Sequence, residues 1–130
     1  ATRPWQHVLD IVDGILKLLS IKGKKVFNKT YIYNIGPNSN KNVKVIDLIK
    51  KFIQISKFIK IKFNYTKLNF SEKKFLTLSS NLFMKDLNWK PAIKLKDSIK
   101  LTSDWYFNFF NNKKDIFNFT IKQIKNQLKF

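Results

Sequence analysis

The chain has 130 residues, 44% of them hydrophobic, which is enough for one domain with a packed core. It contains no cysteine and one histidine, His7, so it can form neither a disulfide framework nor a thiolate metal site, and we expect a reducing, cytoplasmic setting. Its apolar runs are broken by lysine or asparagine every few residues, short of the roughly 20 apolar residues that a membrane span needs. We therefore expect no membrane partner.

The formal net charge of +18 is typical of proteins that bind nucleic acids. Arg3 is, however, the one arginine among 26 basic residues, whereas nucleic-acid surfaces usually contain arginine for its bidentate hydrogen bonds. Lysine, isoleucine, asparagine and phenylalanine fill over half of the chain, and all four have AT-rich codons. We interpret the charge as compositional bias and expect no specific nucleic-acid partner. A self-standing basic RNA-binding module remains the alternative.

Hydrophobic periodicity and turn residues divide the chain into helices and strands. The clearest alternation runs over 59–65, where apolar residues alternate with Lys60, Lys62 and Asn64. In chain order the first half of the sequence predicts a helix over 8–20, a strand over 31–35, a helix capped by Asn42 and a strand over 59–65. The second half predicts an extended run over 75–78, a helix from Ser79 or Ser80 to about Leu87 and a turn at Pro91. A long helix from about Lys96 and a terminal helix follow.

This order of elements predicts a mixed α/β fold. We interpret residues 1–130 as a single lobe, with residues 111–130 as a terminal helical extension. The chain starts directly on the structured-looking phrase ATRPWQHVLD, without methionine, so we expect it to be part of a longer protein.

Three phrases carry a resemblance: RPWQHVLD at the start, YNIGPN at 33–38, and LNWKPAIKLKDSIKLTSDWYFNFF at 87–110. Together they resemble the carboxy-terminal, substrate-binding lobe of the extended short-chain dehydrogenase/reductase family, within the NAD-dependent epimerase/dehydratase group. The form RPWQHVL looks most like the CDP-glucose 4,6-dehydratases. The resemblance implies that an amino-terminal Rossmann lobe is missing from this chain.

The resemblance also implies roles for individual residues. Arg3 matches an arginine that binds the substrate diphosphate, which suits a planar guanidinium, although a surface role is the alternative. Trp5 matches an aromatic residue beside the diphosphate, and ordinary core packing would explain it equally well. Glu72 matches an acidic residue that accepts hydrogen bonds from the ribose hydroxyls, against the alternative of a solvated loop carboxylate. His7 we expect to be structural rather than catalytic.

The intact enzyme implied by the resemblance is a lyase and a homo-oligomer that converts CDP-glucose to CDP-4-keto-6-deoxyglucose, with NAD bound by the missing lobe. It oxidises the sugar at C4, eliminates water across C5 and C6, and returns the hydride to C6. This chain would grip the CDP-sugar and would be inactive alone. Another nucleotide-sugar epimerase or dehydratase of the same superfamily is the alternative enzyme.

The catalytic and cofactor-binding residues of that family have no counterpart in this sequence. None of Gly14, Gly23 and Gly36 belongs to a glycine-rich turn that follows a strand and opens a helix, as dinucleotide binding requires. None of the four tyrosines is followed by lysine four residues later, so the Tyr-x-x-x-Lys acid/base pair is missing. The sequence therefore predicts no catalytic residue, no cofactor site and no metal site within the chain.

Overall fold

The computed structural model describes residues 1–22, 30–37, 43–56, 60, 62, 64 and 73–128. Helices predominate in these residues, and the described sheet has two short strands. In chain order the elements are β1 (Thr2–Arg3), α1 (Val8–Lys22), β2 (Val43–Lys44), α2 (Val45–Ser56), α3 (Asn81–Leu87), α4 (Leu95–Asn111), the 3-10 turn η1 (Lys113–Asp115) and α5 (Ile116–Gln127). A mixed helix-and-strand domain is thus confirmed at a coarse level, but its described sheet is smaller than predicted.

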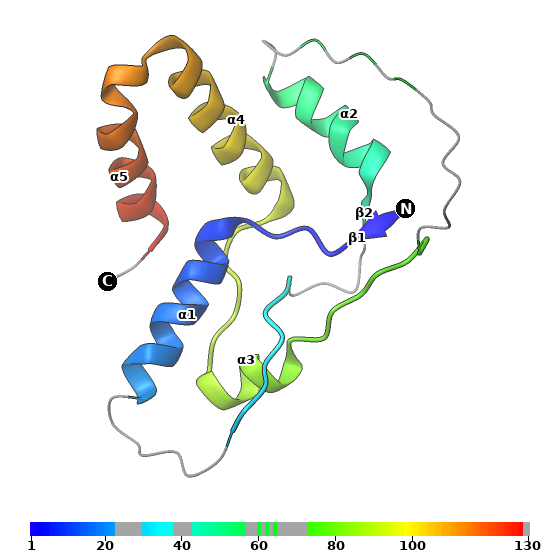
Figure 1. The fold of residues 1–130 in the computed structure, drawn as a ribbon, viewed down its shortest axis with the longest axis vertical. Coiled ribbons are helices and arrows are strands. Elements are labelled where there is room, and N and C mark those ends of the chain that lie inside the picture. The colour runs from blue at the N-terminus through cyan, green and yellow to red at the C-terminus, as the bar shows by residue number, and fades with distance from the viewer. Residues whose placement is uncertain are drawn as a thin grey trace.

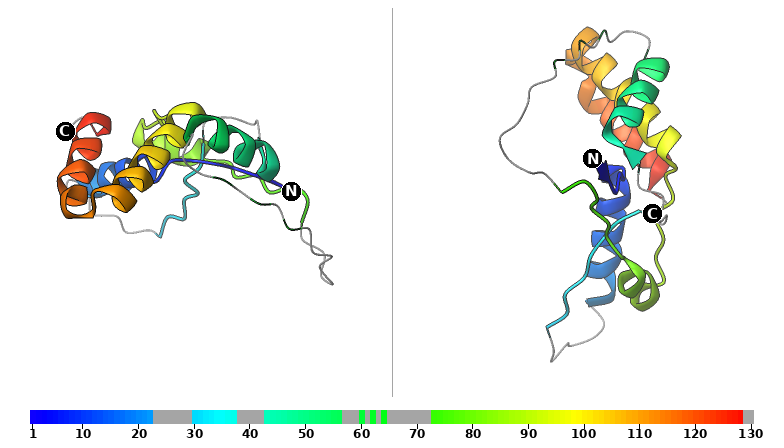
Figure 2. Two further views of the ribbon diagram at one scale, coloured as in Figure 1. Left: turned by 90° about the horizontal axis from the view of Figure 1, so that it is seen from above. Right: turned by 90° about the vertical axis from the view of Figure 1, so that its right-hand side faces the viewer.

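The helices form two groups that meet near the start of α1 (Figure 1). In one group α2 and α5 both pack on α4. The other group contains α1 and α3 together with the extended residues 30–37. Figure 2 shows that the two groups lie end to end, which makes the molecule elongated. Among the described residues, no helix combines the length and the apolar character needed to cross a bilayer.

The short strand β1 joins segments that are far apart in the sequence. It pairs antiparallel with β2, so that Thr2 lies opposite Lys44. Thr2 also forms a parallel bridge with Phe75, and its N–H donates to the carbonyl oxygen of Lys74 at 2.9 Å. β1 therefore lies between β2 and the segment at 74–75, a pairing that two-residue strands do not reveal in the sequence.

Two side-chain hydrogen bonds hold α5 against α4. The indole N–H of Trp105 donates to the hydroxyl oxygen of Thr120 at 2.8 Å, and the amide of Gln123 donates to the carbonyl oxygen of Leu101 at 2.9 Å. The ring of Trp105 also stacks on that of Phe109, with centroids 5.2 Å apart. The predicted terminal extension is therefore a helix that packs back on its predecessor.

A small aromatic cluster forms the core of the other helix group. Phe83, Leu87 and Trp89 are all at least 95% buried, and the ring of Tyr33 packs edge-on against that of Phe83. Gly14 lets α1 approach this cluster closely, since a Cβ atom there would lie 3.1 Å from Phe83 Cε1 and 3.3 Å from Trp89 Cε2. A side chain at this position would overpack the cluster.

The acidic residues of α1 point inward and tie the helix to the turn after α3. The carboxylate of Asp10 accepts hydrogen bonds from the backbone N–H groups of Ala92 and Ile93 at 2.9 and 3.2 Å. Asp13 accepts a hydrogen bond from the indole N–H of Trp89 at 2.7 Å. The chain turns at Asn88, and Pro91 lies in the non-helical segment 88–94 between α3 and α4, which these carboxylates hold against α1.

The strand predicted over 31–35 is wrong as a sheet strand. Residues 30–37 are extended, and Tyr33 and Ile35 pack against the aromatic cluster. The backbone from Ile32 to Gly36 forms no hydrogen bond with any described residue. The side chain of Ile32 is 85% exposed. The β-branched and aromatic residues favour an extended backbone, but a strand also needs a neighbour with which to pair.

The remaining secondary-structure predictions are confirmed only in part. Helices are confirmed at all five predicted places. Ser80 occupies the N-cap position of α3, yet its hydroxyl makes no capping hydrogen bond. The extended run over 75–78 forms a single bridge, at Phe75, instead of a strand. Asn42 and most of the strand predicted over 59–65 lie outside the described residues.

Candidate functional site

Arg3 contacts the segment that follows Glu72. Its guanidinium Nη1 donates to the carbonyl oxygen of Thr2 at 2.7 Å and to that of Lys73 at 3.2 Å. Lys73 directly follows Glu72 in the sequence, while Glu72 itself lies outside the described residues. The fold thus brings Arg3 to the chain neighbour of a second predicted substrate residue, across 70 positions.

The side chain of Trp5 contacts β2, the antiparallel neighbour of β1. The backbone bends at Pro4, where the N–H of Trp5 donates to the carbonyl oxygen of Arg3 at 3.1 Å. The indole N–H of Trp5 donates to the carbonyl oxygen of Val43 at 3.0 Å, so this donor is already used within the protein. What remains for a ligand is the indole ring, which lines two clefts that do not include Arg3.

A cleft of about 400 Å³ lies where the three resembling phrases meet. The first phrase contributes Trp5, Gln6 and Asp10, the second contributes Pro37, and the third contributes residues 91–95. The lining residues are up to 90 positions apart in the sequence, from Trp5 to Leu95, so their convergence comes from the tertiary fold. Residues from all three phrases thus line this one cleft, which makes it the candidate binding site.

Two polar groups of this cleft were not singled out from the sequence. The side-chain amide nitrogen of Gln6 is buried and has no hydrogen-bond partner among the described residues, so it is a donor that a ligand could satisfy. Lys94 is exposed at the edge of the cleft and supplies a positive charge. One donor, one cation and one indole ring suit a polar, anionic ligand with an aromatic portion.

Asp10 also lines this cleft, but its carboxylate is engaged in hydrogen bonds to the backbone. Its two backbone hydrogen bonds, to Ala92 and Ile93, fix the wall of the cleft. Burial raises the pKa of Asp10 above its ordinary value, while these hydrogen bonds and the nearby His7 oppose that rise. Asp10 is therefore a positioning residue, and only its spacing from Gln6 within RPWQHVLD could have indicated that both face one cleft.

His7 caps α1, in agreement with the structural role predicted for it. The side chain is 8% exposed, and its Nδ1 accepts a hydrogen bond from the backbone N–H of Leu9 at 3.2 Å. Burial lowers the pKa of His7, and the charge of Asp10 partly offsets this effect. Because Nδ1 is an acceptor, the neutral ring carries its proton on Nε2.

The described residues do not fit a dinucleotide cofactor. Gly14 lies inside α1 against Phe83, and Gly36 lies against Ser80, where a Cβ atom would come within 3.1 Å of the hydroxyl oxygen. Neither glycine opens a helix after a strand, and Gly23 lies outside the described residues. Within the described part of the chain, no three His, Asp or Glu side chains gather as metal ligands.

No protein-family model matches the chain, and no curated protein or solved structure is significantly similar to it. Its function is therefore inferred from its own residues, from their geometry, and from the resemblance of its three phrases. Of the predicted substrate residues, Arg3 lies in β1 and contacts Lys73, whereas Trp5 follows β1 and contacts β2. Trp5 alone lines the cleft at which those phrases converge.

Proposed function

We propose that the chain is the substrate-binding lobe of an NAD-dependent nucleotide-sugar 4,6-dehydratase that acts on CDP-glucose. The observation that carries this proposal is that residues of all three phrases line one cleft of about 400 Å³: Trp5, Gln6 and Asp10 of the first, Pro37 of the second and residues 91–95 of the third. A chance likeness of three separate phrases would not require them to line the same cavity. Their meeting supports a shared task, and substrate binding is the task that the resemblance implies.

The polar groups around β1 support binding of a nucleotide diphosphate. Gln6 offers a buried N–H donor, and Lys94 offers a positive charge near it. Within β1, the side chain of Arg3 contacts Lys73, the chain neighbour of Glu72, which is the residue matched to ribose binding. Donors and cations that contact phosphate and ribose hold the sugar in one orientation, so they affect the rate without touching the reacting carbon.

Exposed apolar side chains support the proposal that this lobe docks against another lobe. Val8, Val12, Ile15 and Leu19 follow one another at helical spacing along α1, and all four are exposed. Ile32 is also exposed, and it belongs to residues 32–36, whose backbone forms no hydrogen bond with a described residue. In the proposed enzyme a cofactor-binding lobe covers these groups, and its residues perform the oxidation and elimination, since this chain does not fit NAD.

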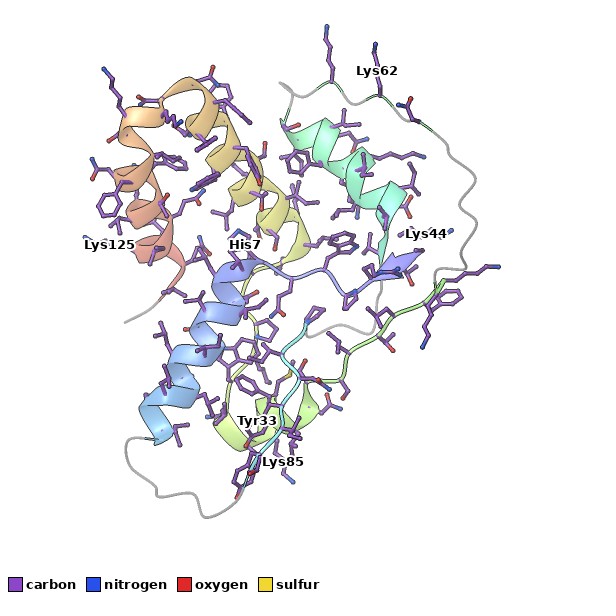
Figure 3. The ribbon with its side chains drawn as sticks, viewed as in Figure 1. His7, Tyr33, Lys44, Lys62, Lys85 and Lys125 are labelled. Atoms are coloured by element: carbon purple, nitrogen blue, oxygen red, sulfur yellow. The ribbon has the colours of Figure 1, made fainter. Side chains whose placement is uncertain are left out.

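The alternative of a self-standing RNA-binding module draws on the net charge of +18. Figure 3 shows four of the described lysines, Lys44, Lys62, Lys85 and Lys125, at different edges of the molecule. A dedicated nucleic-acid surface concentrates its cations on one face. The scattered lysines therefore favour compositional bias over this alternative.

The proposal is tested by nucleotide binding to the polypeptide that carries this chain. CDP-glucose should bind more tightly than dTDP-glucose or GDP-mannose, and with NAD it should be converted to the 4-keto-6-deoxy sugar. Arg3→Lys should weaken CDP-glucose binding by about 1–3 kcal/mol, the usual contribution of a charged hydrogen bond. Lys85→Ala, on the far helix α3, is the matched control and should leave affinity unchanged.

Two results would contradict the proposal. Preference for dTDP-glucose or GDP-mannose would move the assignment to another member of the superfamily. Equal affinity in Arg3→Lys and the unsubstituted protein, measured by calorimetric titration, would remove Arg3 from the substrate site.

A further inference from the structure

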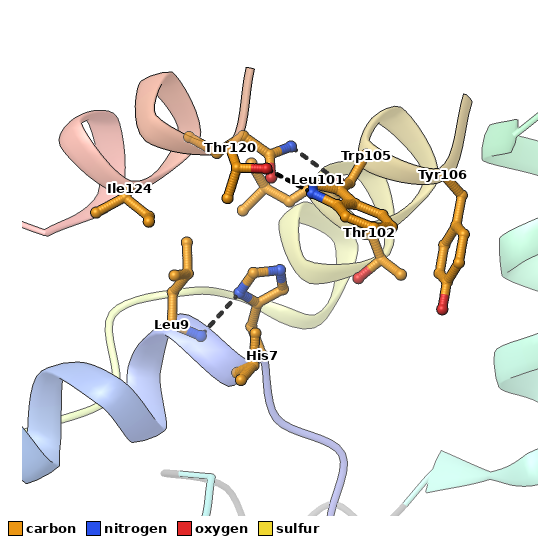
Figure 4. Close-up of a pocket in the computed structure, with 10 residues that line it drawn as sticks. His7, Leu9, Leu101, Thr102, Trp105, Tyr106, Thr120 and Ile124 are labelled. Carbon is orange, nitrogen blue, oxygen red and sulfur yellow. Dashed lines mark hydrogen bonds between the residues drawn. The ribbon is translucent and has the colours of Figure 1, made fainter. Parts of the chain in front are cut away.

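A second cleft, separate from the proposed substrate cleft, lies at the junction of α1, α4 and α5 (Figure 4). Its volume is about 280 Å³. Aliphatic side chains of Leu9, Leu101 and Ile124 and the indole ring of Trp105 form much of its wall. The cleft is thus large enough for a molecule with one ring, since an apolar cavity of about 150 Å³ already holds benzene.

Most polar groups that border this cleft are already satisfied within the protein. The indole N–H of Trp105 donates to Thr120, and the amide of Gln123 donates to the carbonyl oxygen of Leu101. Three donor groups have no hydrogen-bond partner among the described residues, namely Nε2–H of His7 and the hydroxyls of Thr102 and Tyr106. Polar groups in an apolar cleft are therefore few and specific, as in sites for small molecules.

The orientation of His7 decides what this cleft can recognise. Nδ1 accepts the hydrogen bond from Leu9 N–H, so the opposite nitrogen, Nε2, carries the proton and is a donor. In Figure 4 the ring extends from the start of α1 toward α4, where Thr102 and Trp105 lie. Because burial lowers the pKa of His7, the ring is neutral at pH 7 and offers a donor without a positive charge.

We propose that this cleft binds a small neutral molecule with a single aromatic ring and a carbonyl oxygen. The ring packs among Leu9, Ile124 and the indole of Trp105, and the carbonyl oxygen accepts the hydrogen bond from His7 Nε2–H, with the hydroxyl of Thr102 as a second donor. A carboxylate is disfavoured because the neutral imidazole does not compensate its charge in apolar surroundings. The site shares no residue with the proposed substrate cleft, and of the apolar stripe on α1 it includes Val8.

Acetophenone is a suitable probe, because it has one ring and one carbonyl group. The protein is labelled with ¹⁵N-histidine, and the Nε2 resonance of His7 is assigned by its loss in His7→Asn. Titration with acetophenone should shift this resonance saturably, whereas toluene, which lacks the carbonyl oxygen, should bind about 3- to 10-fold more weakly, corresponding to one neutral hydrogen bond.

Three variants make the test specific. His7→Asn keeps an N-cap acceptor for α1 but does not reach into the cleft, so acetophenone affinity should fall about 3- to 10-fold to the level of toluene. Thr102→Val preserves the side-chain shape and should reduce affinity by a smaller factor. Ile124→Phe fills the cleft and should abolish binding of both probes, followed by tryptophan fluorescence.

Each opposite result would overturn the proposal. If acetophenone causes no saturable shift at millimolar concentration, water alone occupies the cleft. If acetophenone and toluene bind equally, His7 Nε2–H takes no part in recognition. If binding persists in Ile124→Phe, the probe lies elsewhere on the protein.

Discussion

Asp10 is the residue on which the position of the turn at 91–93 depends most directly. Asp10→Ala leaves the N–H groups of Ala92 and Ile93 without their acceptor, and the free energy of unfolding should fall by about 1–3 kcal/mol. Asp10→Asn keeps one acceptor oxygen and removes a charge that burial disfavours, so its loss should be below about 1 kcal/mol. Urea denaturation of both variants checks this, and equal losses would contradict it.

His7 should make the stability of the protein depend on pH. Its folded-state pKa lies below the ordinary value of 6.5, so the unfolded chain binds more protons as the pH falls past that value. The free energy of unfolding should therefore decrease from pH 7.5 toward pH 5.5 and then level off below the folded-state pKa. His7→Asn should remove this dependence in denaturation curves measured at each pH.

The same experiment has an internal control in Asp10. The charge of Asp10 raises the pKa of His7 against the stronger effect of burial. Asp10→Asn should therefore lower the pKa of His7 further and make the loss of stability toward pH 5.5 steeper. A shallower loss in Asp10→Asn would show that another group causes the pH dependence.

The sequence singled out individual residues better than it grouped them. Arg3 and Trp5 were chosen from one short phrase. In the structure Arg3 contacts Lys73 and Trp5 contacts Val43, because the backbone bends at Pro4 between them. Gln6 and Lys94 were missed because neither residue has an unusual local pattern. Their importance arises only when segments 88 positions apart meet in the folded chain.

At the scale of elements, the contact between α1 and the aromatic cluster sets a steric limit at Gly14. Gly14→Ala improves helix propensity by up to about 1 kcal/mol. It also places a methyl group 3.1 Å from Phe83 Cε1, in a ring that is 1% exposed and packed between Tyr33 and Trp89. We expect net destabilisation by about 1–2 kcal/mol, since overpacking outweighs propensity in a rigid core.

A double-mutant cycle separates the two effects at Gly14. Phe83→Leu removes the ring that lies nearest to the new methyl group, so Gly14→Ala should be less destabilising in that background, in which Trp89 Cε2 remains a close neighbour. The free energies of unfolding of the four proteins give the coupling directly. Additive changes would mean that Gly14 is not limited by contact with Phe83.

The helices could be predicted because their cause is local. Apolar residues at helical spacing are visible within a single window, as in α2 and α4. Pairing of strands has no such local cause. Thr2 pairs with Phe75 although the sequence predicts no strand at Thr2, and residues 32–36 form no backbone hydrogen bond with a described residue although they favour strands. The sheet therefore could not be predicted from sequence patterns.

At the scale of the whole molecule, the exposed stripe Val8, Val12, Ile15 and Leu19 should govern association. We expect the 130-residue chain on its own to self-associate and to bind a hydrophobic dye. Replacing Ile15 and Leu19 with glutamine should reduce both, measured by sedimentation and dye fluorescence, while circular dichroism stays unchanged. A monomer that binds no dye would contradict the proposal that another lobe covers this surface.

The position of β1 between β2 and the segment at 74–75 also has a kinetic consequence. The hydrogen bond between Thr2 and Lys74 closes a loop of 72 residues, whereas Trp105 and Thr120 are 15 residues apart. Closing the longer loop costs more entropy, so the α4–α5 contact should form earlier in refolding. On the ribosome, β1 must wait for 72 further residues, roughly 4 to 15 seconds at about 5–20 residues per second. Arg3 is thus synthesised long before Lys73, whose carbonyl oxygen its guanidinium contacts in the folded chain.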